Sequence, residues 1–138
     1  MQGCETHGLA DATELPSMLA TLCSYEGLFG SCHPITLRLL TEVGIAFWRL
    51  GRTDDALIIL QRGLRDITRT LGRNHDLRLR ALATLRDIFT EIDDYAKAAA
   101  LQKELLECHA EIFGAGHAET SAARETLAHL LLRNAAAF

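Results

Sequence analysis

The chain has 138 residues, of which 49% are apolar and only two are proline, a composition typical of one folded domain and not of a disordered or collagen-like chain. Its 14 basic and 18 acidic residues give a net charge of −4, which argues against a general nucleic-acid binder. No apolar run approaches the roughly 20 residues that span a bilayer, and the four cysteines match no common disulfide or zinc spacing. We therefore expect a cytoplasmic protein with reduced thiols that binds no nucleic acid, membrane, metal or other cofactor.

The first predicted element is a helix over residues 11–29. Asp11 and Glu14 are spaced as in a capping box, which satisfies backbone groups at the start of a helix. Pro16 is compatible with the early turns of a helix, and apolar residues follow at helical spacing as far as Phe29.

Residues 30–71 contain two further helical stripes separated by a short break. Between Leu37 and Leu50, apolar residues recur every three or four positions, as on one face of a helix. Gly51 interrupts this pattern, and a second stripe begins at Ala56. The segment therefore predicts a pair of antiparallel helices.

The same plan recurs at a fixed interval along the sequence. This interval, which we call the repeat period, is the number of residues from Gly30 to Gly72. Aligned with itself at this offset, the sequence superimposes three glycines and three histidines, namely Gly30, Gly72, Gly114, His33, His75 and His117. Residues 72–113 then form a second repeat, and residues 114–134 supply a partial third repeat or capping helix. We predict an all-α fold of about six helices, a right-handed α-solenoid of antiparallel hairpins within one domain over residues 1–138.

Large, small, aromatic and turn residues stand at fixed positions in the first full repeat, namely Leu40, Val43, Gly44, Phe47, Gly51, Ala56, Leu60, Gly63 and Leu64. Each repeat joint places a glycine three residues before a histidine, and Pro34 follows His33. Over about residues 15–134, these features resemble the tetratricopeptide repeat, in the longer-helix form of kinesin light chains and their bacterial relatives. HEAT repeats have similar periods, but the small residues and the histidine joint favour the tetratricopeptide repeat.

The small residues of the hairpin have a physical role, because helices approach closely where side chains have no bulk. Gly44, Ala56 and Gly63 are such positions in the first repeat. In the second repeat, Arg86 and Leu105 replace small residues, which predicts looser or shifted packing there.

The recurring histidines invite a catalytic or metal-binding interpretation. Successive repeats are displaced by on the order of 20 Å, given interhelical spacings of about 8–10 Å, so the three imidazoles cannot bind one ion. We expect each of them to hydrogen-bond the backbone at a helix joint.

Cys108 and His109 are adjacent and could be read as a pair of metal ligands. Neighbours on a helix point about 100° apart, so we do not expect these two side chains to bind one metal ion. Without a phosphate loop or a nucleophile elbow, we expect no catalytic residue and no enzyme activity.

Arginines cluster near the middle joint, namely Arg62, Arg65, Arg69, Arg73, Arg78 and Arg80. One interpretation is a solvated face balanced by acids such as Asp66 and Asp76. The other is a docking surface for an acidic partner.

The resemblance implies a protein-interaction scaffold whose first helices line a concave groove. The predicted groove residues are Arg38, Thr41, Ile45, Trp48, Arg49, Arg80, Asp87, Glu125 and His129. In this hypothesis Trp48 is an apolar anchor for a protein or peptide, and the arginines bind its carboxylates; packing of Trp48 on the N-terminal helix is the alternative. The paired asparagines that kinesin light chains often carry are replaced here, for example by Thr41 and Glu42, so we do not expect cargo binding in the kinesin manner.

The last helix predicts self-association as a second hypothesis. Its leucines form a wide apolar arc, made by Leu127, Leu130, Leu131 and Leu132. An arc of this kind is usually covered by another chain or by further sequence. The alternative function is therefore a homo-oligomerising regulatory module, such as a homodimer, or part of a larger repeat or multidomain signalling protein.

Overall fold

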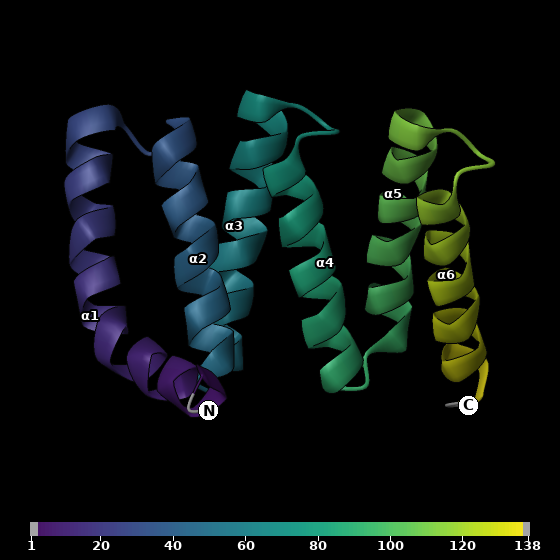
Figure 1. Ribbon diagram of the computed structural model, residues 1–138, viewed down its shortest axis with the longest axis horizontal. Coiled ribbons are helices and arrows are strands. Elements are labelled where there is room, and N and C mark those ends of the chain that lie inside the picture. Colours follow the sequence, from purple (N-terminus) through teal and green to yellow (C-terminus); the bar gives the residue numbers. More distant parts are fainter. Residues whose placement is uncertain (1–2, 137–138) are drawn as a thin grey trace. The chain divides into compact units, whose positions relative to one another are not determined.

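The computed structural model describes residues 3–136, with side chains from residue 14 onward. The described residues form six α-helices and no strand (Figure 1), and the predicted all-α helical repeat is confirmed. The chain divides into two compact units, Met1–Leu71 and Gly72–Phe138, whose boundary coincides with the predicted joint between the first and second repeats. The prediction of one domain stays a prediction.

The first unit contains α1 (Gly3–Phe29), α2 (Pro34–Arg49) and α3 (Thr53–Leu71). α2 packs against both α1 and α3. Because two sides of α2 are covered, nine of its 16 residues are buried, more than one apolar stripe would bury.

α1 starts earlier than predicted. The helix begins at Gly3, so the capping box expected at Asp11 lies inside it and that predicted boundary is wrong. Each residue added to an existing helix gains one hydrogen bond, and the residues before Asp11 include no proline that would stop this extension. Pro16 is therefore in the helix interior, where its missing N–H removes one backbone hydrogen bond.

Close approach of α2 and α3 depends on two glycines. A Cβ atom added to Gly44 would stand 2.7 Å from both Cγ and Cδ2 of Leu60, which is almost fully buried. A Cβ atom on Gly63 would stand 3.2 Å from Cδ2 of Leu40. Each glycine thus leaves space that a leucine of the other helix occupies, as the sequence pattern predicted.

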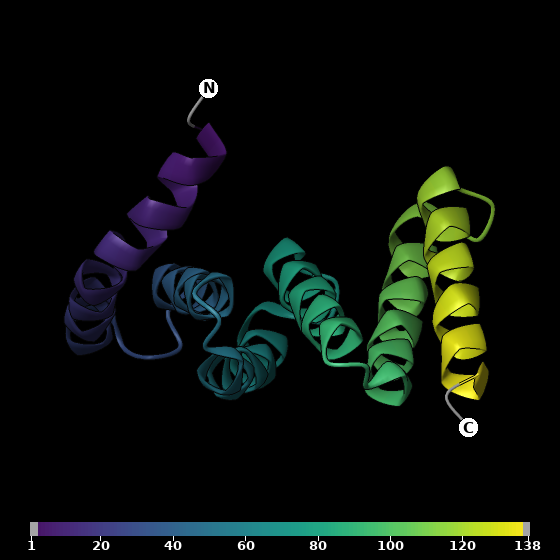
Figure 2. The ribbon, with the colours of Figure 1, turned by 90° about the horizontal axis from the view of Figure 1, so that it is seen from below.

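The second unit contains α4 (Asp76–Glu91), α5 (Tyr95–Phe113) and α6 (Ala118–Ala136). α5 packs against both α4 and α6, and α5 and α6 lie side by side along their lengths (Figures 1 and 2). The core of the second unit is made by side chains with almost no exposure, which include Leu82, Leu85, Ile88 and Cys108.

A polar pair replaces the glycine–leucine contact in the second unit. Arg86 and Gln102 stand one repeat period after Gly44 and Leu60, and Nη1 of Arg86 donates to Oε1 of Gln102 at 2.8 Å. Nε2 of Gln102 in turn donates to the carbonyl of Ala123 at 2.9 Å. These two hydrogen bonds satisfy the amide of Gln102, whose side chain is only 2% exposed. They also connect α4, α5 and α6.

A histidine caps the first helix of each repeat. Nδ1 of His33, His75 and His117 accepts the N–H of the residue two positions later, at 3.2, 3.0 and 3.0 Å. The bond satisfies one of the N–H groups that a helix start leaves without a partner, and the predicted role of the three histidines is confirmed. Three residues before each histidine is a glycine with positive φ, as at Gly72 (102°), a conformation that other residues rarely adopt.

Candidate functional site

The predicted groove residues of α2 fall into two groups. Arg38 and Arg49 are exposed and Trp48 is half-buried, so at least part of each side chain lies at the surface. All three belong to the first helix of the first repeat.

Thr41 and Ile45 are buried, with 2% and 7% of their surface exposed. The hydroxyl of Thr41 donates to the carbonyl of Leu37 in its own helix at 3.0 Å, so its burial leaves no donor unsatisfied. The expectation that these two residues line a binding surface is wrong, because α2 is covered by α1 and α3 together.

In the second unit, the predicted groove residues of α4 and α6 are exposed. They are Arg80 and Asp87 on α4 and Glu125 and His129 on α6. Asp87 accepts two hydrogen bonds from the guanidinium of Arg86, at 3.0 and 2.9 Å. Its carboxylate is therefore already partly neutralised.

The leucines predicted to mediate self-association differ in exposure. Leu130 is 6% exposed and belongs to the core, so its part in that expectation is wrong, whereas Leu131 and Leu132 are 51% and 67% exposed. Leu127 is half-buried and lines, with Leu131, a largely apolar cavity of about 570 Å³ between α5 and α6.

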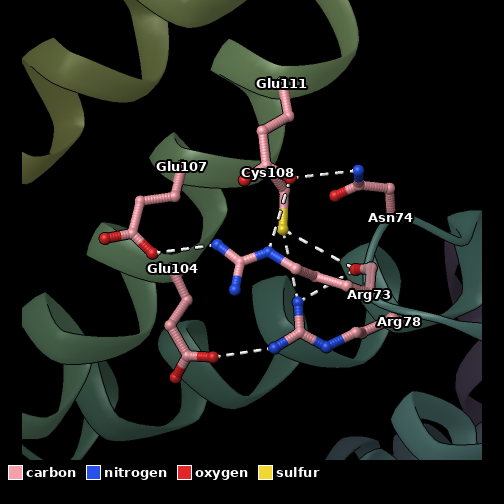
Figure 3. Close-up of polar contacts among 7 residues, drawn as sticks. All are labelled: Arg73, Asn74, Arg78, Glu104, Glu107, Cys108 and Glu111. Carbon is pink, nitrogen blue, oxygen red and sulfur yellow. Dashed lines mark hydrogen bonds and ion pairs between the residues drawn. The ribbon is translucent and has the colours of Figure 1, made fainter.

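A polar cluster joins the start of α4 to α5 (Figure 3). Arg78 is 6% exposed and donates to Sγ of Cys108 at 3.2 Å, to the carbonyl of Arg73 at 3.0 Å and to Glu104 at 2.8 Å. A buried guanidinium is costly unless its N–H groups are paired, and these partners provide that pairing.

The exposed edge of the same cluster is ionic. Arg73 donates to Glu107 at 3.1 Å and lies 3.4 Å from Glu111, and Asn74 donates to Glu111 at 3.1 Å. The hydrogen bond to Glu107, then the charge of Glu111, raises the pKa of Arg73 further above its ordinary value. The two carboxylates thus stabilise the charged form of Arg73.

Sequence reasoning did not identify this cluster as a unit. Arg73 and Arg78 were expected on a solvated or docking face, yet Arg78 is buried. This position is buried in each repeat, since Thr36 and Thr120, one repeat period before and after Arg78, are also buried, but threonine and arginine are polar residues and gave no sequence signal of that burial.

Within the residues whose side chains are described, no group of three or more His, Cys, Asp or Glu is placed to hold a metal ion. None of the helices in the described part of the chain is long and apolar enough to cross a lipid bilayer.

Residues 36–108, more than half of the chain, match the family model of the tetratricopeptide repeat. The chain belongs to the tetratricopeptide repeat family. Repeats of this family generally mediate protein–protein interaction, and the fold is typically a non-catalytic scaffold. No curated protein matches the sequence significantly.

Solved structures with the same fold come from kinesin-light-chain-like repeats. The nearly identical TPR-like repeats of a Podosopora anserina protein described as a kinesin light chain have a TM-score of 0.78 and 18% sequence identity. A point variant of that protein has a TM-score of 0.77 and the same identity. Each match covers 91% of the present chain, which spans 59% of the other chain. The predicted resemblance to repeats of the kinesin light chain type is confirmed, and at this identity it concerns the fold.

Proposed function

We propose that this tetratricopeptide repeat protein is a non-catalytic module that binds a peptide or protein segment through the first helices of its repeats. The observation that supports this most is on α2, where half-buried Trp48 adjoins exposed Arg49, with exposed Arg38 on the same helix. Tryptophan and arginine carry much of the binding energy in protein interfaces. Trp48 is the proposed apolar anchor, and the two arginines are the proposed partners of carboxylates.

In the second unit, the corresponding surface is proposed on α4 and α6. Arg80 is its basic residue on α4, and Glu125 and His129 are its polar residues on α6. Asp87 contributes less, because Arg86 already occupies one of its carboxylate oxygens.

Site-specific photo-crosslinking tests the α2 surface. A photoreactive amino acid replaces Arg38 in one protein and Thr70, an exposed residue of α3, in a matched control. After irradiation in a lysate of the native cell, we expect a crosslinked partner from position 38 and none from position 70. Equal crosslinking from both positions would contradict the proposal.

The partner segment identified in this way is then titrated with the purified protein. Trp48 is the only tryptophan, so its fluorescence reports binding at the proposed anchor. We expect Arg38→Ala/Arg49→Ala to weaken binding roughly tenfold, the loss of two interface arginines at about 0.7 kcal/mol each. Because both residues are exposed, the helical circular dichroism should be unchanged; binding equal to that of the wild type would refute the assignment.

Self-association through α6 is a second candidate, and a second copy of the chain is the proposed occupant of its apolar face. Leu127 and Leu131 stand one repeat period after Leu85 and Phe89, which are buried at 1% and 5% exposure. The equivalent positions of α6 instead line an open cavity. The side chains at these positions of α4 are covered by packing, so we expect a helix of a second copy to cover Leu127 and Leu131 of α6 in the same way.

Sedimentation velocity at micromolar concentration tests this candidate. We expect a dimer that Leu131→Glu/Leu132→Glu converts to monomer, because charges are costly in an apolar contact. Leu28→Glu, a change at an exposed leucine of α1 (76%), is the control and should leave the dimer intact. A wild-type monomer would refute self-association.

A further inference from the structure

The second helices of the two full repeats carry stripes of opposite charge. A shift by one repeat period superimposes the arginines of α3 on the glutamates of α5: Arg62 on Glu104, Arg65 on Glu107 and Arg69 on Glu111. The members of each set are three and four residues apart, so they share one face of their helix. We name these sets the basic stripe of α3 and the acidic stripe of α5.

The acidic stripe is neutralised within its own unit (Figure 3). Arg78 lies 2.8 Å from Glu104, and Arg73 lies 3.1 Å from Glu107 and 3.4 Å from Glu111. Arg73 precedes α4 and Arg78 lies in its first turn. Each glutamate of the stripe therefore faces a guanidinium of the same unit.

The basic stripe lacks the equivalent neutralisation. The residues one repeat period before Arg73 and Arg78 are Ser31 and Thr36, and neither carries a charge. The start of α2 thus supplies no carboxylate at the two positions where the start of α4 supplies two guanidinium groups.

The acids near the basic stripe compensate it only partly. Arg62 lies 3.7 Å from Glu26 of α1, and Arg69 pairs at 2.9 Å with Asp66 of its own helix. Arg65 forms no ion pair with any residue whose side chain is described. Three guanidinium groups therefore share two nearby carboxylates.

The basic stripe also borders a hollow of the surface. This open hollow, of about 580 Å³, lies among side chains of α3 itself, those of the three arginines together with Ile58, Gln61 and Asp66. The side chains of Arg62 and Arg69 are 57% and 67% exposed, and Ile58 is an exposed apolar residue at one end. The arginines are therefore accessible to a molecule that enters this hollow.

We propose that the basic stripe of α3 binds an acidic peptide segment of a partner protein, whose carboxylates contact the arginines as Arg73 and Arg78 contact the acidic stripe. All three cations are arginine, which binds carboxylates through two parallel hydrogen bonds. At about 1.5 Å per residue, the stripe extends over about 10 Å. This length matches acids on two turns of a helix, and an apolar residue beside them would contact Ile58. The proposal concerns a different helix from the α2 surface and does not depend on it.

Fluorescence anisotropy with a synthetic probe tests the proposal on the full chain. The probe is a labelled alanine-based helical peptide with three glutamates spaced by three and four residues, measured at low and high NaCl. We expect binding that salt weakens and that Arg62→Gln/Arg65→Gln/Arg69→Gln weakens at least about tenfold, since three charge-assisted contacts are lost. The control Lys97→Gln/Lys103→Gln/Arg124→Gln removes the same charge from the second unit and should retain binding within about twofold of wild type.

Charge reversal separates recognition from damage to the fold. Arg62→Glu/Arg65→Glu/Arg69→Glu should lose the glutamate peptide and bind the same peptide with lysines in place of glutamates. The proposal is overturned if the control variant loses as much affinity as the arginine variant, or if a single-stranded oligonucleotide binds the stripe more tightly than the peptide. It is also overturned if the chain associates with itself at low salt through the basic stripe, because a second copy would then be the occupant.

Discussion

An alanine at Gly44 should destabilise the protein although alanine is the better helix former. Within a helix, Gly→Ala gains about 1 kcal/mol. The new Cβ atom would stand 2.7 Å from two atoms of Leu60, and forcing a methyl group into a packed core typically costs about 1–3 kcal/mol. One of these atoms is Cγ, which cannot move without shifting the rest of a leucine that is only 1% exposed. We expect a net loss of about 1 kcal/mol.

The same change at Gly63 is the matched control. Its Cβ atom would meet Cδ2 of Leu40 at 3.2 Å, a terminal methyl group that can yield by a few tenths of an ångström. The gain in helix propensity then dominates, so Gly63→Ala should be neutral or stabilise by up to about 1 kcal/mol. Urea unfolding followed by circular dichroism measures both variants under the same conditions.

A double-mutant cycle shows whether Leu60 is the cause. In a Leu60→Ala background, the obstructing side chain is absent, so Gly44→Ala should now stabilise by about 1 kcal/mol. The reasoning fails if Gly44→Ala is as stable as Gly63→Ala, or if its effect is the same with and without Leu60.

Three further variants test single contacts by the urea midpoint. Arg86→Ala removes the donor to the buried amide oxygen of Gln102 and should cost about 1–3 kcal/mol; an unchanged midpoint would show that this bond is not formed. Thr36→Val removes a buried hydroxyl without a partner among the described residues and should stabilise by about 1 kcal/mol, whereas a loss would reveal a hidden partner. His75→Ala removes a helix cap and should cost about 1 kcal/mol, while exposed His129→Ala should change nothing.

The helices and their joints could be predicted because the determining signals are local and occur more than once. A glycine such as Gly72 ends one helix, and three residues later a histidine caps the next. The recurrence of this pair at one fixed period makes a chance pattern improbable. The pattern of large and small residues also predicted contacts correctly, since Gly44 and Gly63 do meet leucines of the facing helix.

Burial on α2 could not be predicted from its own pattern. Thr41 and Ile45 lie off the main apolar stripe, and a helix covered on one side would expose them. Instead α2 is packed against both α1 and α3, and only the three-dimensional arrangement gives this second covered side. The hydrogen bond from Thr41 to its own helix offsets the cost of burying its polar side chain.

The buried position of Arg78 escaped prediction because its partners are distant in sequence. Glu104 and Cys108 follow it by 26 and 30 residues, and arginine is rarely buried without such pairing. Only the packing of α4 on α5 brings the three residues together.

The two repeats use opposite chemistry at matching positions, and this difference is where recognition is best sought. A family pattern marks the size of a side chain, so it treats the contact of Gly44 with Leu60 and that of Arg86 with Gln102 as variants of one hairpin. The family pattern does not constrain the charge of a side chain in this way. If the stripes served only to hold helices together, both would be paired within their own units; the acidic stripe of α5 is, while the basic stripe of α3 retains Arg65 without an ion pair among the described side chains. Ion pairing within the units therefore accounts for the glutamates and for Arg62 and Arg69, but it does not account for Arg65, which a partner with carboxylates would.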